Sequence, residues 1–285
     1  MKKILAVIMA VVLVTVCFAA CGTKNNEVNK ETTYSIADAY AAVKFEPAEI
    51  SGDDYDYIKS NGKLIVGITD FEPMDYKDEN GNWIGFDADM AYAFAKWLGI
   101  DVEFVEIDWD NKVLELDGKS IDCVWNGMTL TDEVKSAMEC SNAYCNNAQV
   151  VIVKAADADK YNTVEACKEL TFAVEAGSAG EEIATENGFK ATAVKDQATT
   201  LMEIKSGTCD AAVIDKLMAA AMVGEGTNYA DLTYTVDLNS EEYGVGFRKG
   251  SELADAFNNF LKQATDNGFI EVVAEQYGVQ ASLIK

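Results

Sequence analysis

Residues 125–135, WNGMTLTDEVK, combine a glycine, two hydroxyl side chains and the start of a predicted helix. Gly127 lets the backbone come close to a ligand, and Thr131 is a favourable residue for the N-cap. Thr129 adds a hydroxyl beside the unpaired amides of the first helical turn, a place that favours anions. Val134 stands in that turn, where an anion site would gain from a positive charge. The segment therefore predicts a ligand-binding edge that lacks a cation.

One acidic and two aromatic residues stand in comparable places, directly after predicted strands. Asp215 follows the buried run AAVI (211–214), where its carboxylate either caps the next helix or faces a ligand. Phe71 and Trp109 are each, taken alone, more often core residues than cleft residues. Together, on loops after strands, they favour a box for an apolar group or for a cation over their π faces.

The composition excludes several classes of site. The chain of 285 residues has no His, and Arg248 is its only Arg. Triads that need imidazole, His-ligated zinc and haem held by His are thereby excluded. The net charge of −25 disfavours nucleic acid as a partner, because phosphate neutralisation needs Lys and Arg. The cysteines lack CxxC spacing, so we expect neither a metal nor a cofactor, while a Cys140–Cys145 bridge stays open.

The N-terminus has the pattern of a targeting segment. Lysines at positions 2 and 3 precede an apolar run from Ile4 to Ala20, and two alanines stand directly before Cys21. These are the parts of a signal peptide. Their order resembles a bacterial lipoprotein signal, in which such a cysteine is acylated and becomes the mature N-terminus. We therefore expect a signal peptide over 1–20 and a flexible tether over 21–49. A plain signal peptide or an uncleaved anchor is the alternative.

Beyond the tether, hydrophobic patterning predicts alternating strands and helices. One series runs from a strand at Leu64–Thr69, through an amphipathic helix at Phe86–Leu98 that ends at Gly99, to a short helix at Thr131–Met138. A second begins with a strand at Gln149–Val153 and has another at Tyr243–Phe247. Such alternation is typical of parallel sheets with crossover helices. Trp125 alternates with Asn126 along a predicted buried strand and is expected to pack in the core. The length suffices for two domains, so the expected fold class is α/β with two similar lobes.

Several runs, in this chain order, resemble the family-3 extracellular solute-binding proteins, the amino-acid receptors of ABC importers. They are KLIVGITDFEPMDYKDENGNWIGFDADMAYAFAKWLGIDVEF (63–104), DWDNKVLEL (108–116), IDCVWNGMTLTDEVK (121–135), EAGSAGEE (175–182), CDAAVID (209–215) and YGVGFRKGSEL (243–253). The series covers about residues 60–280, and its specificity lies in the order of the motifs, since no single motif is specific.

The resemblance implies the type II periplasmic-binding-protein fold, in which two lobes, each a mixed sheet flanked by helices, hold the ligand between them. By analogy, lobe 1 would comprise residues 50–146 and 249–285, and lobe 2 residues 147–248. Two hinge segments would cross between the lobes, near Tyr144–Asn147 and near Arg248–Gly250.

The resemblance also implies ligand-binding residues. Asp215 would receive the ammonium group of the ligand, and Phe71 and Trp109 would flank its side chain. Val134 stands where the family has an Arg that binds the ligand's carboxylate. Either helix amides and hydroxyls suffice for a carboxylate here, or the ligand lacks one. The full expected set is Asp70, Phe71, Trp109, Asn126, Gly127, Thr129, Ser178 and Asp215.

Two further acids, Glu72 and Glu175, flank these positions and are interpreted as solvated loop side chains. Because they would still lie near the cleft, we expect a pocket that is net negative, with Val134 as an apolar wall. Such a pocket would prefer ligands with a net positive charge and reject dicarboxylic ones such as glutamate.

The leading hypothesis is a lipid-anchored receptor on the extracytoplasmic face of the cell membrane, which delivers an amino acid or a related small amine to an ABC permease. Its expected partners are the ligand, the transmembrane subunits of the permease and the membrane, and we expect a monomer. An exported enzyme on the same fold, such as a dehydratase, would need a general acid or base and a cation, which the missing His and Arg disfavour. A ligand-sensing module is disfavoured because no signalling segment follows Lys285. The sequence does not fix the identity of the ligand.

The position of Cys21 leads to a first prediction. We expect mass spectrometry of the native mature protein to find residue 21 at the N-terminus and lipid-modified, because one such terminus anchors a soluble body at a membrane. An unmodified start at another residue would contradict the prediction.

Overall fold

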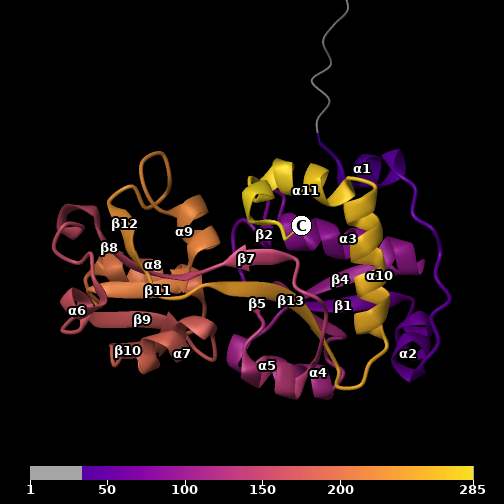
Figure 1. Ribbon diagram of the computed structural model, residues 1–285, viewed down its shortest axis with the longest axis horizontal. Helices are drawn as coiled ribbons and strands as arrows, with labels where there is room; N and C mark the ends of the chain where they lie inside the picture. The colour runs from indigo at the N-terminus through magenta and orange to yellow at the C-terminus, as the bar shows by residue number, and fades with distance from the viewer. Residues whose placement is uncertain (1–33, 285) are drawn as a thin grey trace, which may run out of the picture. The chain divides into compact units, whose positions relative to one another are not determined.

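The computed structural model describes residues 34–284; the predicted signal peptide and Cys21 lie outside them. Two β-sheets organise this part of the chain, and helices flank each of them (Figure 1). We call the part built on the six-stranded sheet lobe 1, and the part built on the five-stranded sheet lobe 2. The expected α/β fold with two lobes is confirmed.

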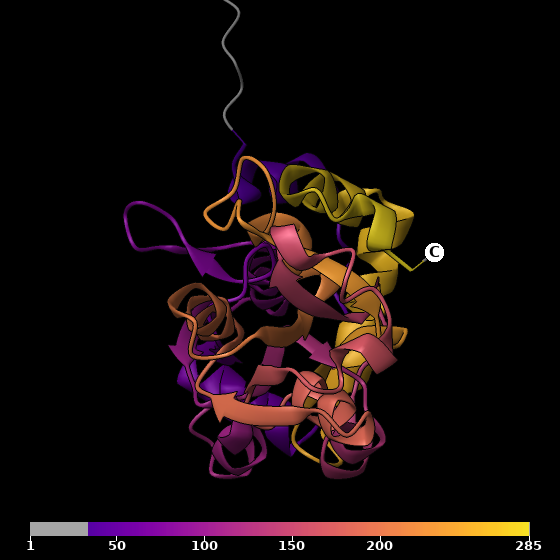
Figure 2. The same ribbon diagram turned by 90° about the vertical axis from the view of Figure 1, so that its left-hand side faces the viewer.

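The strands of lobe 1 are β1 (Lys63–Ile68), β2 (Tyr76–Lys77), β3 (Trp83–Ile84), β4 (Asp101–Glu106), β5 (Cys123–Thr129), β6 (Glu139–Cys140), β7 (Cys145–Asn147) and β13 (Glu241–Phe247). The main sheet has the order β4-β1-β5-β13-β6, and β7 also pairs with β13. Strand β1 is parallel to β4 and β5, whereas β13 is antiparallel to β5. Strands β2 and β3 form a separate hairpin, whose turn projects outward in the side view (Figure 2).

The strands of lobe 2 are β8 (Gln149–Lys154), β9 (Thr171–Glu175), β10 (Lys190–Val194), β11 (Ala211–Asp215) and β12 (Leu232–Asp237). Their order is β10-β9-β11-β8-β12. Strand β9 is parallel to β10 and β11, and β8 is antiparallel to both of its neighbours. Each lobe thus has a mixed sheet with a parallel part, and ligands bind at the carboxyl ends of such strands.

The helices of lobe 1 are α1 (Ile36–Ala42), α2 (Asp53–Asn61), α3 (Phe86–Leu98), η1 (Trp109–Asn111), α4 (Lys112–Asp117), α5 (Asp132–Ala137), α10 (Leu253–Asp266), α11 (Phe269–Tyr277) and η3 (Gln280–Ser282). Those of lobe 2 are η2 (Ala155–Asp157), α6 (Val164–Cys167), α7 (Ala179–Glu186), α8 (Gln197–Ser206) and α9 (Lys216–Met222). Helix α3 has the predicted bounds and ends at Gly99, whose φ of 71° suits glycine.

The core of lobe 1 follows from the alternation of side chains along β5. Trp125 faces α10 and packs edge-on against Phe257, with 4.8 Å between the ring centroids. Val124, on the other face of the strand, belongs to a separate apolar cluster that includes Val134 of α5. Trp125 is 1% exposed, so its expected place in the core is confirmed.

The expected boundary between the lobes at residue 248 is wrong. Strand β13 pairs with β5 in lobe 1, so the chain returns from lobe 2 after β12, through residues 238–240. The other crossing passes through β7, and β7 and β13 pair as antiparallel strands where the chain changes lobe. The alternating pattern of residues 243–247 predicted a strand but could not tell which sheet it joins. Arg248, expected at a crossing, instead lies inside lobe 1.

The flexible tether expected over residues 21–49 is too long. Helix α1 packs on the core of lobe 1, and the hydroxyl of Tyr34 donates to Asp89 Oδ2. The backbone of Glu46 accepts a hydrogen bond from Trp97 Nε1 and donates one to Gln263 Oε1. Residues 34–49 therefore belong to lobe 1. The polar composition of this segment predicted a tether. It gave no indication of the partners that hold the segment on lobe 1, because these lie far away in the sequence.

Three further features concern only residues 34–284. The five cysteines in this range are free thiols, so the Cys140–Cys145 bridge left open above does not form. No helix in this range is long and apolar enough to cross a membrane. Nor does this range contain three or more His, Cys, Asp or Glu side chains arranged so that they could hold a metal ion.

Arg248 provides a test of the fold. Its guanidinium is 2.7 Å from Asp54 Oδ1 and 3.0 Å from Asp122 Oδ1, and it donates to the carbonyl of Ile121. We expect Arg248→Met to lower the free energy of unfolding by about 3 kcal/mol, because two nearly buried carboxylates lose their cation. Urea unfolding measures this change.

The neighbouring Lys249→Met is the matched control. The Lys249 side chain is 55% exposed and lies 3.9 Å from Glu139, so its loss should cost about 1 kcal/mol or less. Equal effects of the two substitutions would contradict a structural role for the Arg248 cluster.

Candidate functional site

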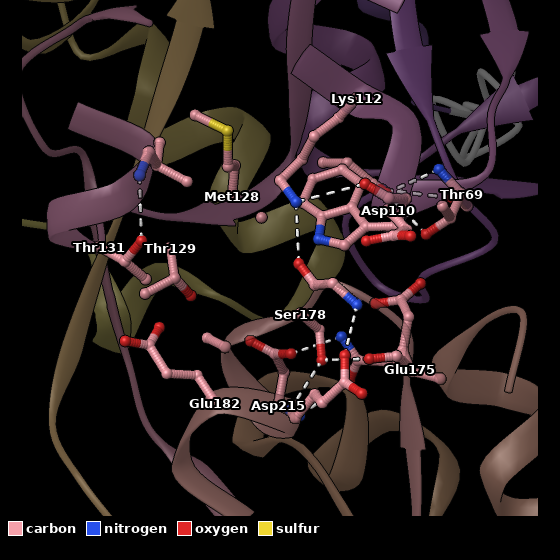
Figure 3. A pocket seen from close by; sticks show the side chains of 18 of the residues that line it. Thr69, Asp110, Lys112, Met128, Thr129, Thr131, Glu175, Ser178, Glu182 and Asp215 are labelled. Atoms are coloured by element: carbon pink, nitrogen blue, oxygen red, sulfur yellow. Dashed lines mark hydrogen bonds between the residues drawn. The ribbon is translucent and has the colours of Figure 1, made fainter. Parts of the chain in front are cut away.

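A pocket of about 440 Å³ lies between the lobes. Lobe 1 lines it with the ends of β1 and β5 and with η1 and α4; lobe 2 lines it with the ends of β9 and β11 and the start of α7 (Figure 3). Pockets for small molecules span about 300–1,000 Å³, so this one suits a small solute. Its place at the carboxyl ends of strands is where open α/β sheets bind ligands.

Seven of the eight expected residues come together in this pocket. They are Phe71, Trp109, Asn126, Gly127, Thr129, Ser178 and Asp215. Asp70 is exposed and does not line the pocket, because consecutive residues of an extended segment face opposite sides. Phe71 takes the inner side, held by backbone hydrogen bonds with Asp75. The structure thus does not bring Asp70 together with the other expected residues, and its role in ligand binding stays a prediction.

Asp215 is 4% exposed and ends β11. Its side chain does not cap α9; instead its carboxylate accepts hydrogen bonds from Asn147, Gln197 and Tyr243. All three donors are neutral, and no Lys or Arg in the described part of the chain forms an ion pair with Asp215. Burial, followed by the charge of Glu241, raises the pKa of Asp215 to about 7. A cation in the pocket would favour its charged form.

Asp215 is also hydrogen-bonded to the two strands at the crossing between the lobes. Asn147 stands on β7 and Tyr243 on β13. Asn147 Nδ2 donates both to Asp215 and to Glu241 Oε1, which also accepts from Thr129 Oγ1 and Gln149 Nε2. This network joins the pocket to the place where the chain passes between the lobes.

Asn126 and Gly127 form the floor of the pocket through contacts inside lobe 1. The Asn126 amide donates to Asp75 Oδ2 and to the carbonyl of Thr69, so both of its N–H groups are used there. Gly127 has a φ of +55°, and a Cβ at this position would lie 2.6 Å from Phe71 Cε1. Glycine is therefore needed for the close packing of Phe71, while the Asn126 side chain holds the floor in place.

Several hydroxyls expected to meet the ligand already have partners within the protein. Thr129 Oγ1 donates to Glu241, and Ser178 Oγ donates to the carbonyl of Glu175 while it caps α7 at Glu181 N. Thr131 Oγ1 accepts from Val134 N at the start of α5, as expected of an N-cap. Val134 is 7% exposed and lines the pocket as an apolar wall. The amide of Val134 is thus not free for an anion.

Lys112 is one of several pocket residues, Gln197 among the others, that the sequence did not single out. It opens α4, is 9% exposed, and donates through Nζ to the carbonyls of Trp109 in lobe 1 and Gly177 in lobe 2. Nζ also lies 5.1 Å from the centroid of the Trp109 ring. A signal was present, because residues three apart in a helical segment share one face. Once Trp109 was assigned to the cleft, Lys112 should have followed it.

Glu175 also differs from expectation. It is 3% exposed and lines the pocket, and its Oε1 has no hydrogen-bond partner in the described part of the chain. Burial, followed by the charge of Asp215, raises its pKa well above the usual range. The interpretation as a solvated loop acid is therefore wrong for Glu175. Glu72 does not line the pocket.

The pocket has a strong excess of acidic side chains. Lys112 is the single basic residue that lines it, among those the structure describes, against seven acids: Asp110, Glu133, Glu175, Glu181, Glu182, Glu186 and Asp215. A pocket whose walls carry charges of one sign raises the local concentration of ligands of the opposite charge. The geometry fits a small solute that carries at least one cation.

Comparison with known proteins agrees with this arrangement. The sequence profile of the bacterial extracellular solute-binding proteins, family 3, matches residues 64–280. The arginine-binding extracellular protein ArtP of Bacillus subtilis (strain 168) is 33% identical over 225 residues, which are 75% of this chain and 86% of ArtP.

Two solved structures show the same fold. A mutant of ArgBP from T. maritima is 33% identical with a TM-score of 0.74, covering 79% of this chain and 99% of its own. The ancestral amino acid-binding protein AncCDT-1, described as a precursor of cyclohexadienyl dehydratase, is 34% identical with a TM-score of 0.72 and the same coverage of both chains.

The raised pKa of Asp215 predicts how stability depends on pH. At pH values between the ordinary pKa of an aspartate and about 7, the Asp215 carboxyl holds a proton in the folded protein that it releases in the unfolded chain. Stability of the ligand-free protein should therefore fall as the pH rises through this window, by up to about 1.4 kcal/mol per pH unit for one such group.

We expect Asp215→Asn to flatten part of this decline, as measured by urea unfolding between pH 4.5 and 7.5. Other buried acids, such as Asp87, account for the remainder. The exposed Asp159 of lobe 2 supplies the control, since Asp159→Asn should leave the profile unchanged. An unchanged slope in Asp215→Asn would contradict the prediction.

Proposed function

The chain belongs to the bacterial extracellular solute-binding proteins, family 3, and from this premise we propose that it captures an amino acid between its lobes for an ABC importer. The ligand would enter the open cleft, and closure of the lobes about β7 and β13 would bury it. The closed form would then be recognised by the transmembrane subunits of a permease.

The environment of Asp215 is the observation on which this proposal rests. A buried carboxylate with three neutral donors and no cation is costly to ionise, and a ligand ammonium would supply the missing charge. The carboxylate lies at the junction of both crossing strands, so a ligand bound there would contact the part of the molecule that governs closure.

The charge of the pocket supports a basic amino acid as the ligand. Glu175 presents a second buried carboxylate, and its free Oε1 offers an acceptor to a cationic side chain. Phe71 and Trp109 would hold the apolar part of that side chain or stack against its cationic group. The name of ArtP, an arginine-binding protein, points in the same direction.

We further propose that the protein works at the outer face of the cell membrane, held there by lipid on Cys21. The family is described as extracellular, and the segment before Cys21 has the order of a lipoprotein signal. A single lipid-bearing terminus would leave the two lobes free to meet the permease. As a receptor, the protein would release its ligand unchanged.

An enzyme on the same fold is the second candidate. Glu175, with its raised pKa, and Lys112 are the kind of acid and cation that such chemistry would need, and both line the pocket. AncCDT-1 connects this fold with a dehydratase. The two candidates differ in the fate of the ligand, since a receptor returns it intact and an enzyme does not.

The proposal predicts a ranking of ligands. Isothermal titration at pH 7.5 should find arginine or lysine bound at least about 100-fold more tightly than glutamate, because a second anion meets several carboxylates in a closed cleft. Asp215→Asn should weaken binding of the preferred amino acid by about 2 kcal/mol or more, through loss of a charged hydrogen bond. For the unaltered protein, affinity should fall as the pH drops below about 7, since Asp215 becomes protonated.

Glu175→Gln separates recognition of the ligand's side chain from that of its ammonium group. It should reduce the preference for arginine over glutamine while the protein stays folded. Tight glutamate binding, or unchanged affinity in Asp215→Asn, would overturn the assignment. Mass spectrometry of the ligand released by denaturation tests the enzyme candidate, because a converted product would replace the receptor proposal.

A further inference from the structure

Lys112 has an unusual environment for a buried lysine. Its ammonium group has three N–H donors, and the structure gives it two acceptors, the carbonyls of Trp109 at 3.2 Å and Gly177 at 2.8 Å. No carboxylate in the described residues lies within ion-pair distance of Nζ. Burial lowers the pKa of Lys112, and the charges of Glu175 and Glu133 oppose this shift. A buried charge of this kind lacks a counter-ion.

Several other polar groups of the pocket already have partners within the protein. The Asn126 amide and the hydroxyls of Thr129 and Ser178 donate to protein acceptors, and the Thr131 hydroxyl accepts from the Val134 amide. Lys112 therefore combines a positive charge with a third N–H for which the structure records no acceptor. It points into the same pocket as Asp215, which comes from the opposite lobe (Figure 3).

We infer that Lys112 receives the carboxylate of the ligand through a charged hydrogen bond from Nζ, and so decides whether the site takes amino acids or simple amines. This inference rests on the proposed function, because it assigns a second anchor for the same ligand. The ammonium group of the ligand meets Asp215, and its carboxylate meets Lys112. The two anchors stand on different lobes, so both are engaged only when the lobes are close.

The contact with Gly177 links this anchor to closure. Gly177, at the start of the loop before α7, has a φ of +68°, and a Cβ there would lie 2.7 Å from the Cα of Asp110. Only glycine allows the two lobes to approach so closely at this point. Lys112 spans the same junction, since its partners Trp109 and Gly177 belong to different lobes. A carboxylate held here would add its charge at the place where the lobes meet.

Pairs of ligands that differ only in the carboxylate test the inference: arginine with agmatine, lysine with cadaverine, and histidine with histamine. In the unaltered protein, the preferred amino acid should bind more tightly than its amine. Lys112→Met should weaken binding of the amino acid by about 30-fold, which corresponds to the loss of one charged hydrogen bond. It should weaken binding of the matching amine by about threefold or less. Isothermal titration measures both members of each pair.

Two further variants separate charge from structure. Lys112→Gln keeps an N–H donor for the Gly177 carbonyl but removes the charge, so it should lose the preference for the carboxylate as Lys112→Met does. Lys112→Arg keeps the charge and should retain most of that preference. Lys96→Met is the matched control, because Lys96 is an exposed lysine of lobe 1 outside the pocket. Thermal unfolding of each variant establishes that it is folded.

The outcomes distinguish this inference from the function on which it rests. Equal weakening of an amino acid and its amine in the Lys112 variants would show that Lys112 only links the lobes, and would overturn the inference while the receptor proposal stands. Equal binding of amino acid and amine by the unaltered protein would overturn it as well. If the unaltered protein binds none of the three amino acids, the proposal of an amino-acid receptor of this charge class fails first, and the inference fails with it.

Discussion

The arrangement of this protein depends on a carboxylate that is buried without a cation. Asp215 stands at the end of β11 and is held by neutral donors from α8 and from β7 and β13, the two strands that pair where the chain crosses between the lobes. Burial makes its ionised form unfavourable, and an ammonium group bound beside it would reverse that balance. Under the proposed function, binding and the geometry of the crossing would therefore be linked through one side chain. Glu241 extends this link to Thr129 of β5.

The rest of the pocket distributes charge around this centre. A receptor for a zwitterion needs a positive group for the ligand's carboxylate and a negative group for its ammonium. An excess of acidic side chains suits a ligand that carries two cationic groups. Because of Val134, the part of α5 that lines this pocket has no positive group, but the helix start is already capped by Thr131, so an apolar side chain there costs little. The basic side chain of the pocket stands instead on α4, where Lys112 Nζ lies over the Trp109 ring. If it holds the carboxylate of the ligand, as inferred above, this cation would act on closure as well as on recognition.

The sequence was sufficient for the elements and insufficient for their assignment to sheets. The bounds of α3 and the buried position of Trp125 followed from periodicity, because each depends on local spacing and a nearby glycine. Strand β13 was predicted as a strand but assigned to the wrong lobe, since pairing with β5 joins residues more than a hundred positions apart. Residues 34–49 were taken for a tether for the same reason. Polar composition says little about partners such as Gln263.

The candidate site shows the same division between local and distant information. Residues that follow strands, such as Thr129 and Asp215, could be placed because the carboxyl ends of strands converge on one pocket. Glu175 was misjudged because its burial depends on α8 and β11, which approach it only in the folded lobe. Lys112 was passed over because a lysine near a helix start usually faces solvent. Its spacing from Trp109 indicates that it faces the cleft, but its burial is completed only where Gly177 of lobe 2 meets α4, which the sequence of lobe 1 does not indicate.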